Sequence, residues 1–94
     1  MPPLGIEFSS RFRAQARALP AGRRKAVAET LTALSAAFGQ PHLHSGLGIR
    51  RLMGAYFEVR VDRETRVIFK VERSVASILL VGNHDDVERF LKNR

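Results

Sequence analysis

The sequence predicts an α+β fold, with an N-terminal strand and two helices packed on one face of an antiparallel sheet (four-stranded meander) and a short C-terminal helix. Apolar residues recur at helical spacing up to about residue 38. From residue 49 to residue 82 they alternate with polar residues at the period of a strand. The length of 94 residues fits a single domain, residues 1–94, with one core.

The N-terminal part is expected to form one strand and two helices. Residues 5–9 form the strand, and Ser9 or Ser10 caps the first helix. Pro20 ends that helix and suits the first turn of the next, which runs to about residue 38. Four residues at helical spacing share the buried face of the second helix: Val27, Leu31, Leu34 and Phe38.

The C-terminal part is expected to form the meander. Its four strands are residues 49–53, 56–61, 66–72 and 75–82. The last is the most continuously apolar and is therefore a central strand. Asp85 or Asp86 caps a final helix over residues 87–92. The predicted core is Phe8, Phe12, Val27, Leu31, Leu34, Phe57, Val59, Val67, Phe69, Ile78 and Leu80.

Strict alternation in the hairpin of residues 56–72 places charged side chains on one face. Glu58 and Arg60 point away from the predicted core, and so does Arg66. In one register Arg60 lies opposite Arg66, and in the other it lies opposite Ile68 and diagonal to Arg66. Like charges opposed across two strands destabilise a sheet. Either Glu58 offsets the arginine pair, or the pair binds an anion such as a phosphate.

The neighbouring residues extend this basic face. Arg50 and Arg51 lie on the adjacent strand, so one of them faces the same side, and Lys70 extends the patch.

Three histidines complete the set of candidate residues. His84 follows the last strand directly, and its ordinary pKa of about 6.5 suits general acid–base chemistry. His42 and His44 lie in a loop next to the basic strand.

The net charge and the amino-acid composition favour some classes of function and exclude others. The formal charge of +7 favours a polyanion or an acidic protein as partner. The absence of Cys excludes disulfides, thiolate metal sites and a Cys nucleophile. With three His, a zinc site would also need carboxylates, so we expect no metal, and no cofactor motif occurs. No apolar run approaches the roughly 18 residues of a membrane span, and the N-terminus lacks a signal peptide, so we expect a cytoplasmic protein.

Three segments resemble the RelE/ParE toxin superfamily. They are GIRRLMGAYFEVRV at residues 48–61, TRVIF at 65–69 and LLVGNHDDV at 79–87. They are similar to the family patterns K-R-L-x-G, Y-E-x-R-V, Y/H-R-V-I-Y/F and V-G-H-R-x-x-V-Y. The order of predicted elements agrees, and the resemblance covers nearly the whole chain.

The resemblance implies the toxin of a type II toxin–antitoxin pair, neutralised by a cognate acidic antitoxin. RelE-like members are endoribonucleases that often cut mRNA on the ribosome, whereas ParE-like members inhibit DNA gyrase. Arg66 matches the family arginine associated with the scissile phosphate, and His84 matches the histidine of G-H-R. Asp85 stands where many relatives have Arg, and the C-terminal Tyr of several ribonucleases is missing.

The leading hypothesis is a metal-independent endoribonuclease. Arg66 and Arg60 stabilise the phosphate, His84 is the acid or the base, and Glu58 or His42 supplies the other function. The expected RNA-binding residues are Arg50, Arg51, Lys70, His42 and His44. The alternative is a ParE-like DNA gyrase inhibitor or a basic binding module without enzymatic activity.

Overall fold

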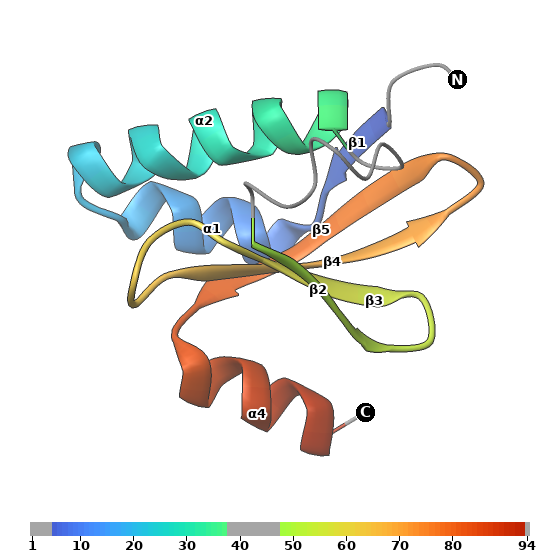
Figure 1. The fold of residues 1–94 in the computed structure, drawn as a ribbon. Helices are drawn as coiled ribbons and strands as arrows, with labels where there is room; N and C mark the ends of the chain where they lie inside the picture. The colour runs from blue at the N-terminus through green and yellow to red at the C-terminus, as the bar shows by residue number, and fades with distance from the viewer. Residues whose placement is uncertain (1–4, 38–47, 94) are drawn as a thin grey trace.

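The computed structural model describes residues 5–37 and 48–93. The elements are β1 (Gly5–Phe8), α1 (Ser10–Ala18), α2 (Ala21–Ala37), β2 (Ile49–Met53), β3 (Tyr56–Arg60), β4 (Arg66–Glu72), β5 (Val75–Gly82) and α4 (His84–Lys92). Helices α1 and α2 cover one face of the sheet, and α4 lies on the other (Figure 1). No helix in the described ranges combines the length and the apolarity that crossing a membrane requires.

The predicted α+β fold is confirmed, and its sheet has five strands in the order β1-β5-β4-β3-β2. The four-stranded meander is antiparallel, as expected. The N-terminal strand adds a fifth, parallel strand beside β5, so the whole sheet is mixed. Strand β5 is thereby flanked on both sides, which agrees with its apolar sequence.

Strand β1 pairs with only the first half of β5, and α1 provides partners for the rest. Ser9 caps α1 by accepting a hydrogen bond from Phe12 N, and its hydroxyl donates to the Leu79 carbonyl at 2.8 Å. Gln15 Oε1 accepts from Val81 N at 2.9 Å. Because these side chains satisfy the open edge of β5, α1 is held firmly against the sheet.

The main core lies between α1, α2 and the sheet. Nearly all predicted members of this layer are buried, and Phe57 packs against it partly buried. Phe8 was predicted to be buried and is 42% exposed. It is the last residue of an edge strand, and the Phe12 ring stacks on it at 5.5 Å between centroids. Phe38 lies outside the described residues.

A second, smaller core lies between the sheet and α4. It contains Ile68, Leu80 and Val87, with Phe90 and Leu91 packed around them. Leu80 was predicted to share a core with Ile78, and this is wrong. The register shifts within the β4–β5 pair, so that Phe69 faces Ile78 whereas Ile68 faces Leu80. The bulge at the intervening residue moves Leu80 to the α4 side.

Helix α4 starts earlier than the sequence predicted. Asn83, not Asp85 or Asp86, is the N-cap, and His84 is the first helical residue. Asn83 Oδ1 accepts from Asp86 N at 2.9 Å, and Asp86 Oδ2 accepts from Asn83 N at 2.8 Å. This reciprocal capping box explains the difference, because Asp86 acts from the third helical position instead of from the cap.

Candidate functional site

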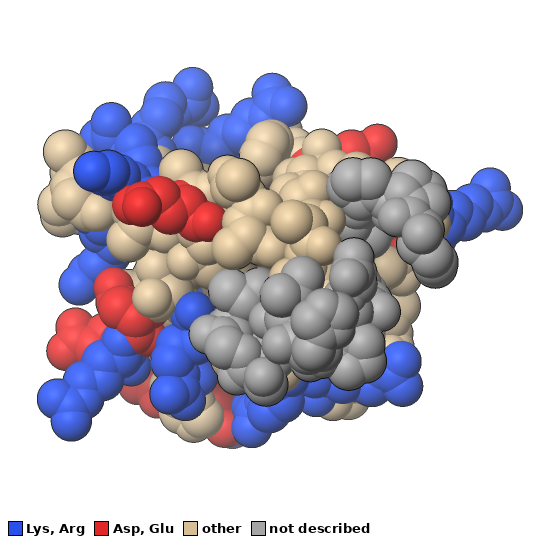
Figure 2. Space-filling model, turned by 45° about the horizontal axis from the view of Figure 1, so that its top comes forward, with Lys and Arg blue, Asp and Glu red and all other residues tan. Residues whose placement is uncertain are grey.

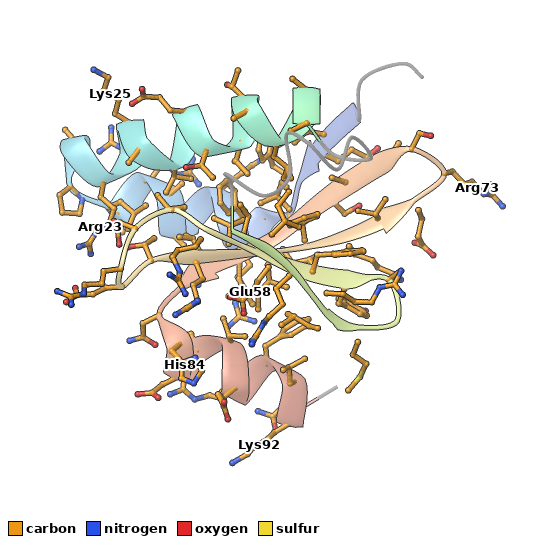
Figure 3. All side chains as sticks on the ribbon, viewed as in Figure 1. Arg23, Lys25, Glu58, Arg73, His84 and Lys92 are labelled. Carbon is orange, nitrogen blue, oxygen red and sulfur yellow. The ribbon has the colours of Figure 1, made fainter. Side chains whose placement is uncertain are left out.

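The centre of the candidate site is an ion-pair cluster on the α4 side of the sheet. Glu58, on the middle strand β3, accepts from Arg66 Nη1 of β4 at 2.9 Å and from Arg50 Nη2 of β2 at 3.2 Å. The Glu58 side chain is 3% exposed, Arg66 is 16% exposed and Arg50 is 65% exposed. Figure 3 shows Glu58 on the side of the sheet that α4 occupies. Adjacent strands therefore converge on one buried carboxylate.

Arg60 lies beside this cluster, two residues after Glu58 on β3. The observed register pairs Arg60 directly with Arg66, which is one of the two registers that the sequence allowed. Arg60 is exposed and forms no ion pair with the part of the chain that the structure describes. Three guanidinium groups against one carboxylate leave a positive excess on this face. Such an excess costs stability within a sheet, and a bound anion relieves it.

One buried donor of Arg66 has no partner. The Nε–H group is inaccessible to solvent and makes no hydrogen bond to residues 5–37 or 48–93. Buried polar groups in proteins are nearly always satisfied, and exceptions are concentrated at sites with a function. An anion with several oxygen acceptors is the chemical complement of this free donor and of the exposed Arg60 beside it.

The other predicted basic residues divide between the two faces. Lys70 lies on the site face but further along β4, with Nζ 5.5 Å from the Tyr56 ring centroid and 3.4 Å from Glu72 Oε1. Arg51 lies on the α1–α2 face, with its guanidinium 5.4 Å from the Phe57 ring centroid. Of the pair Arg50 and Arg51, only Arg50 reaches the cluster.

His84 stands at the edge of the site as the first residue of α4. Its Nε2 lies 3.2 Å from Glu88 Oε1, and its side chain is 58% exposed. Arg66 pairs with Gly82, two residues before His84. Two residues span at most about 7 Å, and paired strands lie about 5 Å apart, so the two Cα atoms are within about 13 Å. Arg66 and His84 therefore belong to neighbouring positions at this end of the β4–β5 pair. His42 and His44 fall outside the described residues.

A hollow of about 490 Å³ next to His84 was not foreseen from the sequence. Arg23 is one of its lining residues, and Arg23 Nε lies 3.8 Å from Asp62 Oδ2. Desolvation raises the pKa of Asp62, but hydrogen bonds from Glu64 N and from Thr65, with the charge of Arg23, lower it below its ordinary value. The sequence Asp62–Thr65 has the pattern of an Asx turn, and this pattern could have predicted the hydrogen bonds to Asp62.

A second hollow of about 700 Å³ lies between β1, α1 and α2. Its lining is mostly apolar, and Arg24 stands within it. The half-exposed Phe8 forms part of its wall. Figure 2 brings the α2 side of the molecule forward and shows Lys and Arg side chains projecting around much of the outline. An apolar groove that contains one arginine is therefore present on the face opposite the ion-pair cluster.

Metal chemistry has no support in the described part of the chain. Within residues 5–37 and 48–93, no group of three or more His, Asp or Glu side chains could hold a metal ion. The site offers fixed positive charge together with the imidazole of His84.

Several proteins of known structure share this arrangement of elements. No family model matches the chain, and no curated protein matches it. The RelE–RelB complex of the archaeon Pyrococcus horikoshii matches with 17% identity and a TM-score of 0.70, covering 86% of this chain and 94% of that chain. The RelBE2 toxin–antitoxin complex of Mycobacterium tuberculosis matches with 22% identity and a TM-score of 0.61, covering 87% and 99% respectively.

A third match comes from a structure named for YoeB. The YoeB dimer of Staphylococcus aureus has 19% identity and a TM-score of 0.65, covering 87% of this chain and 98% of that chain. Each match covers most of both chains, so the overall fold is shared. The resemblance seen in the sequence is confirmed for the architecture: this chain has the fold of the RelE-like toxins.

Proposed function

We propose that this chain is the toxin of a type II toxin–antitoxin pair and cuts mRNA as a metal-independent endoribonuclease. The observation that carries the proposal is Arg66, whose guanidinium is held by Glu58 and keeps a buried Nε–H without a partner. Arg60 lies directly opposite and His84 lies two residues beyond the paired strand. The names of the similar structures, RelE and YoeB, support the same class of function.

The reaction needs a proton acceptor, a proton donor and fixed positive charge. A base removes the proton from the RNA 2′-hydroxyl, and the 2′-oxygen attacks the adjacent phosphorus. The bond from phosphorus to the 5′-oxygen breaks, an acid protonates that oxygen, and the products are a 2′,3′-cyclic phosphate and a 5′-hydroxyl. Arg66 and Arg60 stabilise the charge on the phosphate oxygens, and His84 moves a proton at the 2′- or the 5′-oxygen. Both oxygens of Glu58 accept hydrogen bonds from arginines, so we assign it no proton transfer.

The same proposal assigns the apolar groove to the antitoxin. Its wall includes Phe8, Phe12 and Leu31, which match the apolar face of an amphipathic helix. Arg13 and Arg17 are exposed on the neighbouring helix α1, and neither forms an ion pair with the described residues. Acidic side chains flanking the apolar face of the partner helix would complement them. Several of the similar structures are complexes with antitoxins.

The gyrase-directed alternative has less support. One similar structure, from Agrobacterium tumefaciens, carries a joint YoeB/ParE name, whereas others are named RelE, YoeB or YafQ. The unpartnered Nε–H of Arg66 favours a phosphate ligand and gives no reason for a gyrase contact.

The decisive experiment compares RNA cleavage by three proteins. Wild-type protein, Arg66→Gln and Arg73→Gln are incubated with free mRNA and with mRNA on ribosomes, without divalent metal in the free reaction. Figure 3 shows Arg73 at the far end of the β4–β5 hairpin, so its substitution is a control with the same loss of charge. Wild-type protein and Arg73→Gln should yield 5′-hydroxyl ends.

Arg66→Gln should cut about 10²–10³ times more slowly, the usual loss for one preorganised donor. If the wild-type protein cuts neither substrate and its expression induces a DNA-damage response, the gyrase alternative replaces this proposal.

A further inference from the structure

We propose that Glu58 is a positioning residue that occupies Nη1 of Arg66 and thereby reserves the Nε/Nη2 edge of the same guanidinium for a phosphate. This inference deepens the proposed function and rests on it for the identity of the ligand. It assigns to Glu58 neither proton transfer nor contact with the substrate.

The stereochemistry of the guanidinium group carries the inference. Nη1 lies on the side of Cδ, whereas Nε–H and Nη2 point the same way and form a fork that fits two oxygens of a phosphate or a carboxylate. Glu58 Oε2 accepts from Nη1 at 2.9 Å. Nε has no partner, and Nη2 donates no hydrogen bond to the described residues. The carboxylate therefore uses the single nitrogen outside the fork and leaves the fork without a hydrogen-bond partner among the described residues.

The position of Glu58 prevents the ordinary bidentate pair. Its two oxygens accept from arginines on the strands on either side, Oε1 from Arg50 and Oε2 from Arg66. Glu58 pairs directly with Arg50 across β2 and β3, whereas Arg66 lies diagonal to it across β3 and β4. A carboxylate held from both sides cannot turn to offer both oxygens to one guanidinium. Its near-complete burial strengthens both hydrogen bonds.

Two effects of removing the carboxylate run in opposite directions. Glu58→Gln keeps the shape of the side chain but replaces one acceptor oxygen with an NH₂ group, so one arginine loses its partner. The site also gains one positive charge, which favours any bound polyanion. We therefore expect RNA to bind as tightly or more tightly, while the misaligned Arg66 stabilises the transition state less well. A residue that only supports the fold would lower binding and rate together.

The first measurement is independent of cleavage. Two-dimensional ¹⁵N spectra of the arginine Nε–H groups are recorded during titration with inorganic phosphate. In the wild-type protein the Arg66 Nε–H signal should move and saturate, and Arg73→Gln should preserve this response because Arg73 lies at the far end of the β4–β5 hairpin. In Glu58→Gln the response should be lost or weakened. An Arg66 signal in the wild-type protein that ignores phosphate overturns the inference.

The second measurement separates binding from rate. Affinity is measured for a 2′-O-methyl RNA, which lacks the attacking hydroxyl, and kcat is measured on the matching RNA. For Glu58→Gln, affinity should be unchanged or tighter and kcat should fall by about 10² or more. Parallel losses of affinity and kcat would refute the positioning role, as would loss of one limb of the pH–rate profile with the Arg66 signal unchanged.

The two proposals can fail separately. If the wild-type protein cuts no RNA but its Arg66 signal responds to phosphate in a Glu58-dependent way, the positioning role stands and the ribonuclease function falls. If the protein cuts RNA and Glu58→Gln cuts it equally fast, the ribonuclease function stands and the positioning role falls.

Discussion

Among the glycines that the structure describes, Gly82 leaves the least room for an added methyl group. It ends β5, pairs with Arg66 and precedes the N-cap of α4. A Cβ at this position would lie 2.5 Å from Asp86 Oδ2, 2.7 Å from Asp86 Cβ and 2.9 Å from Asp86 Cγ. Real Cβ atoms do not approach heavy atoms that closely, so in Gly82→Ala the side chain of Asp86 or the start of α4 must move.

The cost follows from what Asp86 binds. Its carboxylate accepts from Asn83 N and from Arg89 Nη1, and its backbone N donates to Asn83 Oδ1. Loss of an N-cap interaction destabilises a protein by about 0.5–2 kcal/mol. The Arg89 pair is exposed and adds little. We therefore expect Gly82→Ala to lower the free energy of unfolding by about 1–2 kcal/mol and to loosen the packing of Val87 on the second core.

Gly22→Ala is the matched control for this substitution. Gly22 lies in the first turn of α2, and a Cβ there would meet nothing within 4 Å. Alanine at such a site stabilises a helix by at most about 1 kcal/mol. Urea denaturation followed by circular dichroism distinguishes the two variants, which should change stability in opposite directions. The close-approach argument fails if Gly82→Ala unfolds at the same urea concentration as the wild-type protein.

Three further predictions concern the core, the pH dependence and the partner. Phe69→Ala should cost about 3–5 kcal/mol because Phe69 is fully buried, whereas Phe8→Ala should cost under about 1 kcal/mol; urea denaturation of both tests the placement of the core. Asp62→Asn should be destabilising at neutral pH, and the difference should fade below pH 3.8, because a lowered pKa stabilises the fold only while the carboxylate is ionised; thermal unfolding against pH tests this. An acidic amphipathic helix should bind more slowly at high salt in stopped-flow measurements, and an unchanged on-rate would exclude electrostatic guidance.

Side-chain alternation alone was enough to predict the central hairpin and the grouping of charges on it. Glu58, Arg60 and Arg66 share a face because strands have a period of two, and the apolar residues between them must face the core. Alternation could not predict which of Arg50 and Arg51 lies on the same face as Glu58. A register shift between Arg51 and Met53 in the β2–β3 pair accompanies the turn, and turn geometry decides the parity of the outer strand.

The errors in the predicted core have two separate causes. Leu80 lies in a continuous apolar run, where a bulge changes the face of a residue without changing the sequence pattern. Phe8 is exposed because β1 is an edge strand, and edge position depends on topology. The start of α4 could have been predicted from the sequence, because Asn83 and Asp86 have the spacing of a capping box. The unpartnered Nε–H of Arg66 could not be predicted from the sequence, because it depends on a rotamer that only the packed structure defines.

The charges at the centre of the site are not explained by stability. On the same face of the sheet, Ile68 and Leu80 are buried under α4 as ordinary apolar residues, so this face accepts apolar side chains. Burying Glu58 with Arg66 requires both groups to lose water, and apolar residues of similar volume commonly stabilise a protein as well or better. The arrangement also leaves a buried donor without a partner and sets Arg60 against Arg66. Each of these features costs folding free energy, and a phosphate bound between the arginines would offset all of them at once.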